Sequence, residues 1–514
     1  MKKLLILLSC LLSLYFQQQA HAEQATHQIG STNLQAYFIG LTVYDAEQLI
    51  TYATAHASQT TELVTIDLVA EAIALIYRED GYFLAEVDYT MKGDAVIFQI
   101  HEGWIENAII EGGDTEIANY LEGYLGEIIN ISPLRYSQYE RTIMLMNDLA
   151  GVDVSVTIHY PDTQEGAELH LHVSENEAIT YLSVDNLPRE FGETVNAMIG
   201  HETYSSFSSG DMLRLNIGYS YHSDFGEGDG VIGNIYYQLP IGKDGFYLES
   251  YLSSNYARRD ASGAFQDTEL HGFTSGLLAG YPLVRDTHSY QYLLGEFRYS
   301  EANSEVTNQD FDSSASAVSI TYLAESKDDH GSPSNFSVTL TGGVADDPFI
   351  STGEAPDKTF WHIRAGLGAS RPLSFIDPNT ALRAEVWGQY TTSRLSTVEE
   401  FYLGERDALR GYDFAEVIGD YGVNGTLELS HQFLRPGAFL WDIVPFVYID
   451  AGYADVTDDT FSNPIETLMS TGIGVYAYMQ HGIYMTSYIG IPLIEGPFTD
   501  SGSPAFYLAA SKVW

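Results

Sequence analysis

From Ala178 to Trp514 the sequence alternates apolar and polar residues in about sixteen short segments. This period of two is typical of β-strands with one apolar face. Clusters of Gly, Asn, Asp, Ser and Pro separate the segments, and no apolar stretch long enough for a membrane helix occurs among them. Such a chain can form a soluble multi-sheet protein or a closed barrel in a membrane. Clear examples of the segments span residues 212–221, 245–256, 289–300, 334–341, 446–453 and 505–514.

Two further features favour the membrane barrel. A basic start at Met1-Lys2-Lys3, an apolar run over residues 4–16 and the small-x-small site Ala20-His21-Ala22 predict a secretory signal peptide over residues 1–22. Tyr and Phe gather near segment ends, as the aromatic girdles of outer-membrane barrels do. Because every strand edge must be paired in lipid, the strands have to close. We therefore predict an all-β transmembrane barrel of sixteen antiparallel strands over residues 177–514.

Cysteine and charge exclude several classes of protein. The only cysteine, Cys10, lies inside the predicted signal peptide, so a mature chain starting at Glu23 has no disulfide and no thiolate metal site. Leu7-Leu8-Ser9-Cys10 loosely resembles a lipoprotein cleavage box, but the apolar run continues past it, which disfavours lipidation. The formal net charge of −47 disfavours nucleic acid as a partner. We interpret the acidity as an adaptation for solubility in a salty habitat.

Residues 34–103 and 104–176 follow one β-α-α-β-β plan. In each unit a strand precedes two amphipathic helices, and two strands follow. Asp45 is placed to cap the first helix, and Gly81 and Gly151 stand just past the second helix of their units, where glycine often ends a helix. We predict two small α+β units, each a sheet covered by two helices. An open edge of such a sheet can bind an extended client segment by strand addition.

Few patterns indicate a metal site or catalysis. His170-Leu171-His172 places two histidines on one strand face, but no third ligand is nearby, so we expect them on the solvated face opposite the leucines. The chain has no Gly-x-Ser-x-Gly elbow and no His-Glu-x-x-His motif. The glycine-rich residues 226–230 are acidic and lack a following helix, which indicates a flexible turn. We expect no metal, no cofactor and no catalytic residue.

One long segment, residues 394–420, lies between two alternating stretches and has no strand pattern of its own. Near its centre, Arg410 provides a fixed cation with a planar fork of donors. Gly411 permits a sharp turn beside it, and Tyr412 adds a flat apolar ring with a polar tip. A loop of this length with an Arg-Gly-Tyr core is either functional or an ordinary surface loop.

A carboxylate in a later strand provides a possible partner for this loop. Asp450 alternates with Tyr448 and Gly452 and so should face the barrel interior with them. An inward carboxylate avoids lipid, yet in an acidic protein it needs a cation, which Arg can supply with two parallel hydrogen bonds. We predict that the loop folds into the barrel, that Arg410 pairs with Asp450 and that Gly452 leaves room for the loop. Together with Gly411 and Tyr412 these residues would lock the loop to the barrel.

Several segments, in their order along the chain, resemble one family. They are similar to motifs of the TpsB transporters of two-partner secretion, the haemolysin secretion/activation proteins of the ShlB, FhaC and HecB type, within the BamA-like superfamily. One of them is Leu403–Tyr412, which resembles the signature of the family's sixth extracellular loop. The other similar segments are Arg78–Phe83, His101–Gly103, Glu140-Arg141, Leu149–Val152, Val184–Asn186, Ser209–Leu213, Gly419–Gly422, Glu428 and Tyr448–Gly452.

The resemblance implies a fold and a function. Residues 34–103 and 104–176 would be two periplasmic POTRA domains, and residues 177–514 an outer-membrane barrel of a Gram-negative bacterium. The POTRA domains would bind an unfolded, TpsA-like partner protein, and the barrel would export it to the cell surface without enzymatic activity or cofactors. An alternative is a BamA-like factor that inserts other barrel proteins, although two POTRA domains favour secretion. A passive porin would not need the repeat.

The chain also departs from the family pattern. The family often has an N-terminal plug helix and a linker, but the short segment over residues 23–33 has too few residues for both. The final strand lacks the usual C-terminal phenylalanine. Lys512 interrupts its apolar alternation, and Trp514 would take the role of the terminal aromatic residue.

Overall fold

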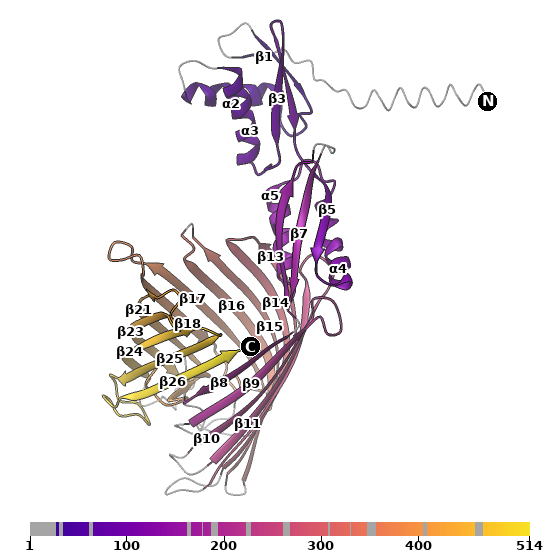
Figure 1. Cartoon of the computed structure of the whole chain (residues 1–514). Coiled ribbons are helices and arrows are strands. Elements are labelled where there is room, and N and C mark those ends of the chain that lie inside the picture. Colours follow the sequence, from indigo (N-terminus) through magenta and orange to yellow (C-terminus); the bar gives the residue numbers. More distant parts are fainter. Residues whose placement is uncertain are drawn as a thin grey trace, which may run out of the picture. The chain divides into compact units, whose positions relative to one another are not determined.

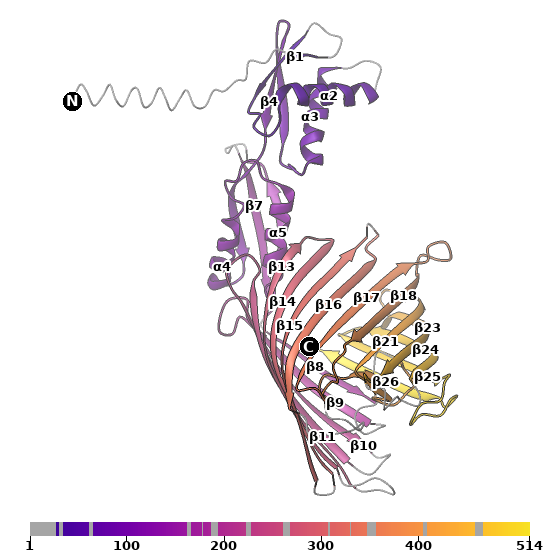
Figure 2. The same cartoon turned by 180° about the vertical axis from the view of Figure 1, so that it is seen from behind.

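The computed structural model divides into two compact units, each shown in Figures 1 and 2. The first unit runs to Asn147 and includes Asp153–Ser174, and the second comprises Asp148–Val152 and Glu175–Trp514. The predicted signal peptide lies outside the described residues. None of the helices in the described ranges combines the length and the apolarity that a membrane span requires. The structure describes residues 27–29, 34–60, 65–161, 166–176, 178–186, 194–222, 228–260, 268–306, 309–328, 330–346, 356–404, 409–457 and 466–514.

The first β-α-α-β-β repeat has the predicted order of elements. Its sheet has the strand order β1-β2-β4-β3, so that β3 has a neighbour on one side within the described residues. Asp45 caps α2 as expected, since its carboxylate accepts hydrogen bonds from the N–H groups of Glu47 and Gln48 at 3.0 and 3.1 Å. The elements are β1 (His27–Gln28), β2 (Gln35–Ile39), α2 (Ala46–Thr60), α3 (Ile66–Glu79), β3 (Glu86–Lys92) and β4 (Ala95–His101).

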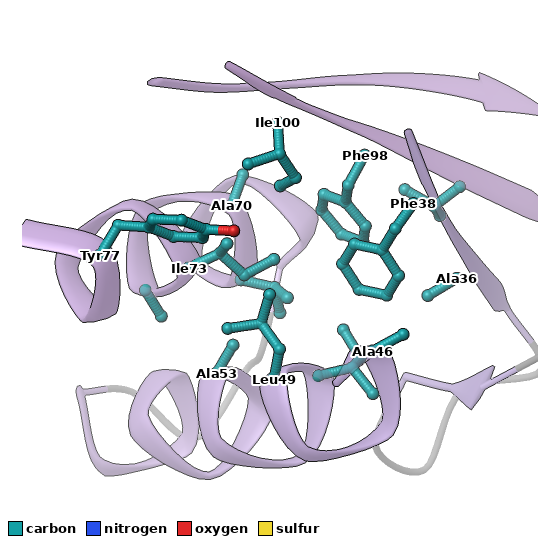
Figure 3. Close-up of a cluster of buried hydrophobic side chains, with 14 of the residues drawn as sticks. Ala36, Phe38, Ala46, Leu49, Ala53, Ala70, Ile73, Tyr77, Phe98 and Ile100 are labelled. Atoms are coloured by element: carbon teal, nitrogen blue, oxygen red, sulfur yellow. The ribbon is translucent and has the colours of Figure 1, made fainter. Parts of the chain in front are cut away.

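An apolar core joins the two helices of this repeat to its sheet (Figure 3). Phe38 of β2 and Phe98 of β4 stack with ring centroids 5.5 Å apart. Leu49 of α2 and Ile73 of α3 are fully buried against them. The apolar side chains on one face of the strands and one face of each helix therefore pack into one core. This packing is the physical basis of the predicted β-α-α-β-β plan.

The second repeat has the same plan, with the sheet order β5-β7-β6. Gly81 and Gly151, just past the second helix of each repeat, have φ angles of 89° and 74°, a conformation that favours glycine. In β7, His170 and His172 lie on the face opposite the fully buried leucines, as expected. The repeat is confirmed as part of the fold class, while the bounds of separate domains stay predictions. Its elements are β5 (Ile105–Gly112), α4 (Thr115–Leu125), α5 (Tyr136–Asn147), β6 (Val152–His159) and β7 (Ala167–Glu175).

The second unit is a closed antiparallel barrel. Because β21 and β22 follow one another and both pair with β23, they form one interrupted strand, and the barrel has the predicted sixteen strands. The strands are β8 (Ala178–Asp185), β9 (Thr194–Tyr204), β10 (Met212–His222), β11 (Gly228–Pro240), β12 (Tyr247–Arg259), β13 (Thr268–Arg285), β14 (Ser289–Val306), β15 (Gln309–Lys327), β16 (Pro333–Asp346), β17 (Thr359–Pro372), β18 (Thr380–Tyr390), β21 (Tyr421–His431), β22 (Phe433–Leu434), β23 (Leu440–Asp455), β24 (Thr467–Met479), β25 (Ile483–Pro492) and β26 (Ala505–Val513).

The barrel strands alternate between an exposed apolar face and a buried polar face. In β23, Val447 and Ile449 are exposed, whereas Tyr448 and Asp450 are buried. In a closed barrel the exposed apolar face meets lipid and the other face meets the interior. The first and last strands meet in a short seam, because β26 pairs with β8 over the five residue pairs from Ala509–Asp185 to Val513–Tyr181.

The long loop after β18 contains secondary structure that the sequence did not indicate. Two three-residue strands, β19 (Phe401–Leu403) and β20 (Val417–Gly419), pair with each other. The prediction that residues 394–420 have no strand was therefore wrong. Three residues are too few to display a period of two, and the pairing is stabilised by burial of Phe401 and Leu403 in a small apolar cluster.

Candidate functional site

Arg410 lies between two buried carboxylates of the barrel wall. Its Nε and Nη2 atoms donate to Oδ2 and Oδ1 of Asp450, each at 2.9 Å, which is a bidentate pair. Its Nη1 atom donates to Glu428 Oε2 at 2.8 Å, and its backbone N–H donates to Asp450 Oδ2 at 3.1 Å. Asp450 is 0% exposed. The structure thus brings together Arg410 of the loop, Asp450 of β23 and Glu428 of β21.

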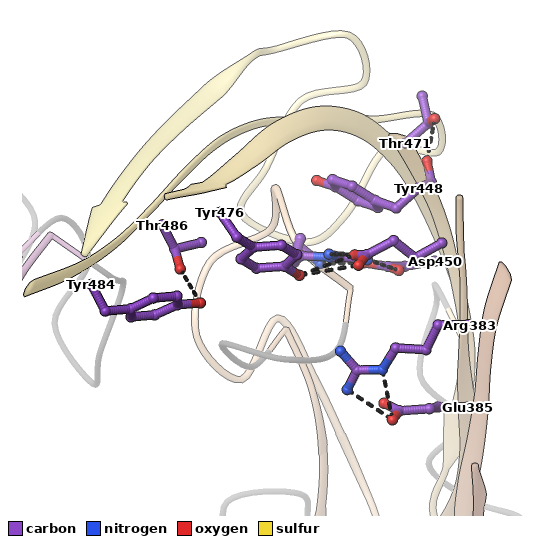
Figure 4. Close-up of polar contacts among 10 residues, drawn as sticks. Arg383, Glu385, Tyr448, Asp450, Thr471, Tyr476, Tyr484 and Thr486 are labelled. Atoms are coloured by element: carbon purple, nitrogen blue, oxygen red, sulfur yellow. Dashed lines mark hydrogen bonds and ion pairs between the residues drawn. The ribbon is translucent and has the colours of Figure 1, made fainter. Parts of the chain in front are cut away.

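Aromatic rings surround the same guanidinium. The Arg410 Cζ atom lies 3.5 Å from the ring centroid of Tyr448, within the range of a cation–π contact. Tyr476 donates its hydroxyl to Glu428 at 3.1 Å, and Tyr448 and Tyr476 both lie beside Asp450 in Figure 4. Burial of both carboxylates beside these rings strengthens their attraction to Arg410 but also raises the cost of leaving a carboxylate without its cation.

Two glycines allow the loop to approach the wall closely. Gly411 has a φ angle of 106°, and a Cβ atom built on it would lie 3.0 Å from the carbonyl carbon of Gly490 in β25. A Cβ atom on Gly490 would lie 2.7 Å from the Cα atom of Gly411. Backbone therefore contacts backbone at this point, and a side chain on either residue would force the loop away.

Tyr412 and Gly452 also lie at the loop–wall contact. The Tyr412 hydroxyl is positioned to donate to the carbonyl oxygens of Met469 and Ile494, at 2.8 and 2.7 Å. A Cβ atom on Gly452 would lie 2.7 Å from Leu409 Cδ1, so the glycine does leave space for the loop. All five predicted residues therefore gather at one place, whereas their role as a lock stays a prediction.

Three further carboxylates fix the loop, and sequence reasoning did not assign them. Glu416 accepts hydrogen bonds from the N–H groups of Phe498 and Thr499, at 2.7 and 2.8 Å. Asp420 accepts from the N–H group of Leu395 at 2.7 Å. The third is Glu399, which contacts Arg298 and His362 of the barrel wall. These residues lie in an irregular segment, in which no period predicts the direction of a side chain.

The remaining sequence features are the loop and the acidic turn, which lie partly outside the described residues, and the two histidines of β7. Residues 405–408 of the loop and 226–227 of the acidic turn are not among those described. His172 Nδ1 lies 3.1 Å from Glu111 Oε2, and His170 Nε2 lies 2.9 Å from Glu168 Oε1. Within the described ranges, no group of three or more His, Cys, Asp or Glu residues is arranged to hold a metal ion.

Gly490→Ala should destabilise the barrel by displacing the tip of the loop. An added methyl group meets backbone atoms, which cannot rotate away, so we expect a loss of about 1–3 kcal/mol in the free energy of unfolding. The matched control is Gly233→Ala in β11, where nothing lies within 4 Å of the added atom. Denaturation of the full chain in detergent micelles measures both variants, and equal stability of the two would contradict the close approach.

The comparisons with known proteins agree with this architecture. The family model for haemolysin secretion/activation proteins ShlB/FhaC/HecB matches residues 168–477. The hemolysin transporter protein ShlB of Serratia marcescens is 22% identical over 382 residues, which cover 72% of this chain and 66% of that relative. The match thus spans slightly less than two thirds of the relative's length.

Solved structures share the fold. CdiB from Escherichia coli superposes with a TM-score of 0.73 at 16% identity, and the match covers 97% of this chain and 94% of CdiB. BamA from Haemophilus ducreyi lacking POTRA domains 1–3 gives a TM-score of 0.54 at 15% identity, with 95% of this chain and all of that chain covered. The polar-lined barrel, its inward loop and the preceding α/β repeats define the class of outer-membrane β-barrel proteins that carry α/β repeats before the barrel. Since the family model covers more than half of the sequence, the chain belongs to the ShlB/FhaC/HecB family of haemolysin secretion/activation proteins.

Proposed function

We propose that this outer-membrane protein exports one specific partner protein from the periplasm to the cell surface by two-partner secretion. The observation that carries the proposal is the family match over residues 168–477, which contains the five residues predicted to lock the loop to the barrel. We also propose that residues 34–103 and 104–176 are two periplasmic POTRA domains. Folding of the partner outside the cell would make its return unfavourable, so no catalytic residue is required.

The edge of β3 is the site that we propose for binding the partner. A cavity of about 650 Å³ lies between α3 and β3, lined by Ala70 and Ala74 of the helix and by Val87 and Tyr89 of the strand. An extended segment that entered this cavity could pair with β3 as an additional strand. The backbone would supply affinity, and alternate side chains of the segment would contact the helix.

The geometry of the hairpin shows which donors of β3 are available. Lys92 pairs with Ala95 across a two-residue turn, and such flanking pairs are joined by hydrogen bonds. Because strand residues alternate, the N–H groups of Val87, Tyr89 and Met91 then point away from β4, toward the open edge. Met91 is 50% exposed, so its side chain contributes little to the core.

Met91→Pro should weaken export of the partner, by about tenfold if one backbone hydrogen bond and the local strand geometry are lost. Met91→Ala is the matched control, because it removes the same side chain but keeps the N–H group. The measurement is the amount of a candidate exported partner at the cell surface when that partner is expressed together with either variant. Equal export by the two variants would exclude strand addition at this edge, and export that does not depend on the transporter would exclude two-partner secretion for that pair.

One observation favours a second candidate function. The short seam between β26 and β8 is the kind of weak junction that an insertion factor for other barrel proteins would open. Depletion of the protein distinguishes the candidates. An insertion factor would reduce many outer-membrane barrels at once, whereas a secretion transporter would reduce only its own partner at the surface.

A further inference from the structure

The first limb of the loop makes a second set of ion contacts with the barrel, separate from those of Arg410. Glu399 is 1% exposed, and both of its carboxylate oxygens accept from Arg298 Nη2 of β14, at 2.6 and 2.8 Å. His362 of β17 contacts the same carboxylate through Nε2 at 3.0 Å. A single loop carboxylate therefore joins two strands that are not neighbours in the barrel.

Neighbouring groups hold the same limb against the same wall. Arg364 and Gln389 donate to the backbone carbonyl oxygen of Glu399, at 3.2 and 3.1 Å. The hydroxyl oxygens of Ser396 and of Ser313 in β15 lie 2.8 Å apart. The limb is thus held by β14, β15, β17 and β18, whereas Arg410 is held by β21 and β23.

The two sets of ion contacts use different charges. Arg298 contacts Glu399, while Arg410 contacts Glu428 and Asp450. In these ion pairs the two sets share no charged group. Four strands separate β14, which carries Arg298, from β21, which carries Glu428, so the two sets of ion contacts use different strands of the wall.

We propose that Glu399 is a positioning residue that holds the first limb of the loop across the resting pore, independently of Arg410. The inference rests on the proposed function only in taking the barrel interior as the transport path. Opening the path requires the limb to leave β14, β15, β17 and β18. The Glu399 carboxylate sets the free energy of that step through charge-assisted hydrogen bonds, which are about twice as strong as neutral ones.

The test is the conductance of the full-length protein in planar lipid bilayers, without any partner protein. Glu399→Gln keeps the shape but removes the charge, and we expect the ratio of open to closed time to rise about tenfold. Glu301→Gln is the matched control, since Glu301 lies on β14 with Arg298 but its carboxylate accepts from Tyr299 and Asn303. A wild-type open fraction for Glu399→Gln would overturn the proposal.

A reversible cross-link separates displacement of the limb from a general loss of structure. The only cysteine of the chain, Cys10, lies in the predicted signal peptide, so Ser313→Cys with Ser396→Cys introduces one pair of thiols at positions whose hydroxyl oxygens lie 2.8 Å apart. Added to Glu399→Gln, the oxidised pair should restore the low open fraction, and a reductant should raise it again. Failure of the pair to form, or to restore closure, would overturn the proposal. Absence of an exported partner would instead count against the proposed function and leave this result intact.

Discussion

Arg410→Ala and Asp450→Ala should each reduce export of the partner to a small fraction of the wild-type level. Removing Arg410 leaves Asp450 and Glu428 buried without their cation, which costs about 3–5 kcal/mol for a broken buried pair. The loop tip then has no favourable position against β21 and β23. The chain has a net charge of −47 and therefore no surplus of cationic side chains that could replace Arg410.

Conservative variants separate charge from geometry. Arg410→Lys keeps the cation, but a lysine cannot form the bidentate pair with Asp450 while also reaching Glu428. Export by this variant should therefore fall as well. The exchange of charges, Arg410→Asp with Asp450→Arg, should restore export only in part, because Glu428 also binds the native guanidinium. Surface-exposed partner and bilayer conductance are the two measurements. Wild-type values for both alanine variants would show that the pairing has no functional role.

The sequence allowed prediction wherever a regular period carried the information. The direction of Asp450 followed from its alternation with Tyr448 and Gly452, and the number of barrel strands followed from the same alternation. In the α/β repeats, the helical spacing of apolar residues and the cap at Asp45 led to the correct order of elements. In each of these cases the local pattern and the burial of one face agree.

Other parts of the site depend on register and on irregular backbone, which no local pattern specifies. Glu428 meets Arg410 because β21 pairs with β23 in a register that places it opposite Tyr448. Glu399 lies in a non-repeating segment, so its direction could not be predicted. Gly490 lies 79 residues after Gly411 in the sequence, and only the folded barrel brings the two glycines into contact.

Glu102→Ala should strongly destabilise the first repeat. Glu102 is 6% exposed and accepts hydrogen bonds from the backbone N–H groups of Thr42 and Val43, at 2.7 and 3.0 Å. It also accepts from the Tyr77 hydroxyl at 2.8 Å. Alanine leaves these donors without an acceptor, for which we expect a loss of about 3–5 kcal/mol. That is a large fraction of the roughly 5–15 kcal/mol that stabilises a typical domain.

The segment over residues 23–176, expressed alone, provides the measurement. We expect it to give an α+β circular dichroism spectrum and to unfold cooperatively in urea. Glu71→Ala, an exposed carboxylate in α3, is the matched control and should change stability by no more than about 0.5 kcal/mol. If Glu102→Ala proved as stable as this control, the hydrogen bonds of the buried carboxylate would not stabilise the first repeat.

The same contact gives the segment a pH dependence with a definite sign. Burial, and then the hydrogen bond to Glu102, raise the pKa of Tyr77 above its usual value. The folded state therefore keeps the phenolic proton more tightly than the unfolded state, whose tyrosine has a pKa of about 10. The corresponding stability is fully present below that pH and is lost as the pH rises above it. Tyr77→Phe should remove this part of the decline above pH 10, because phenylalanine fills the same space without a titrating group.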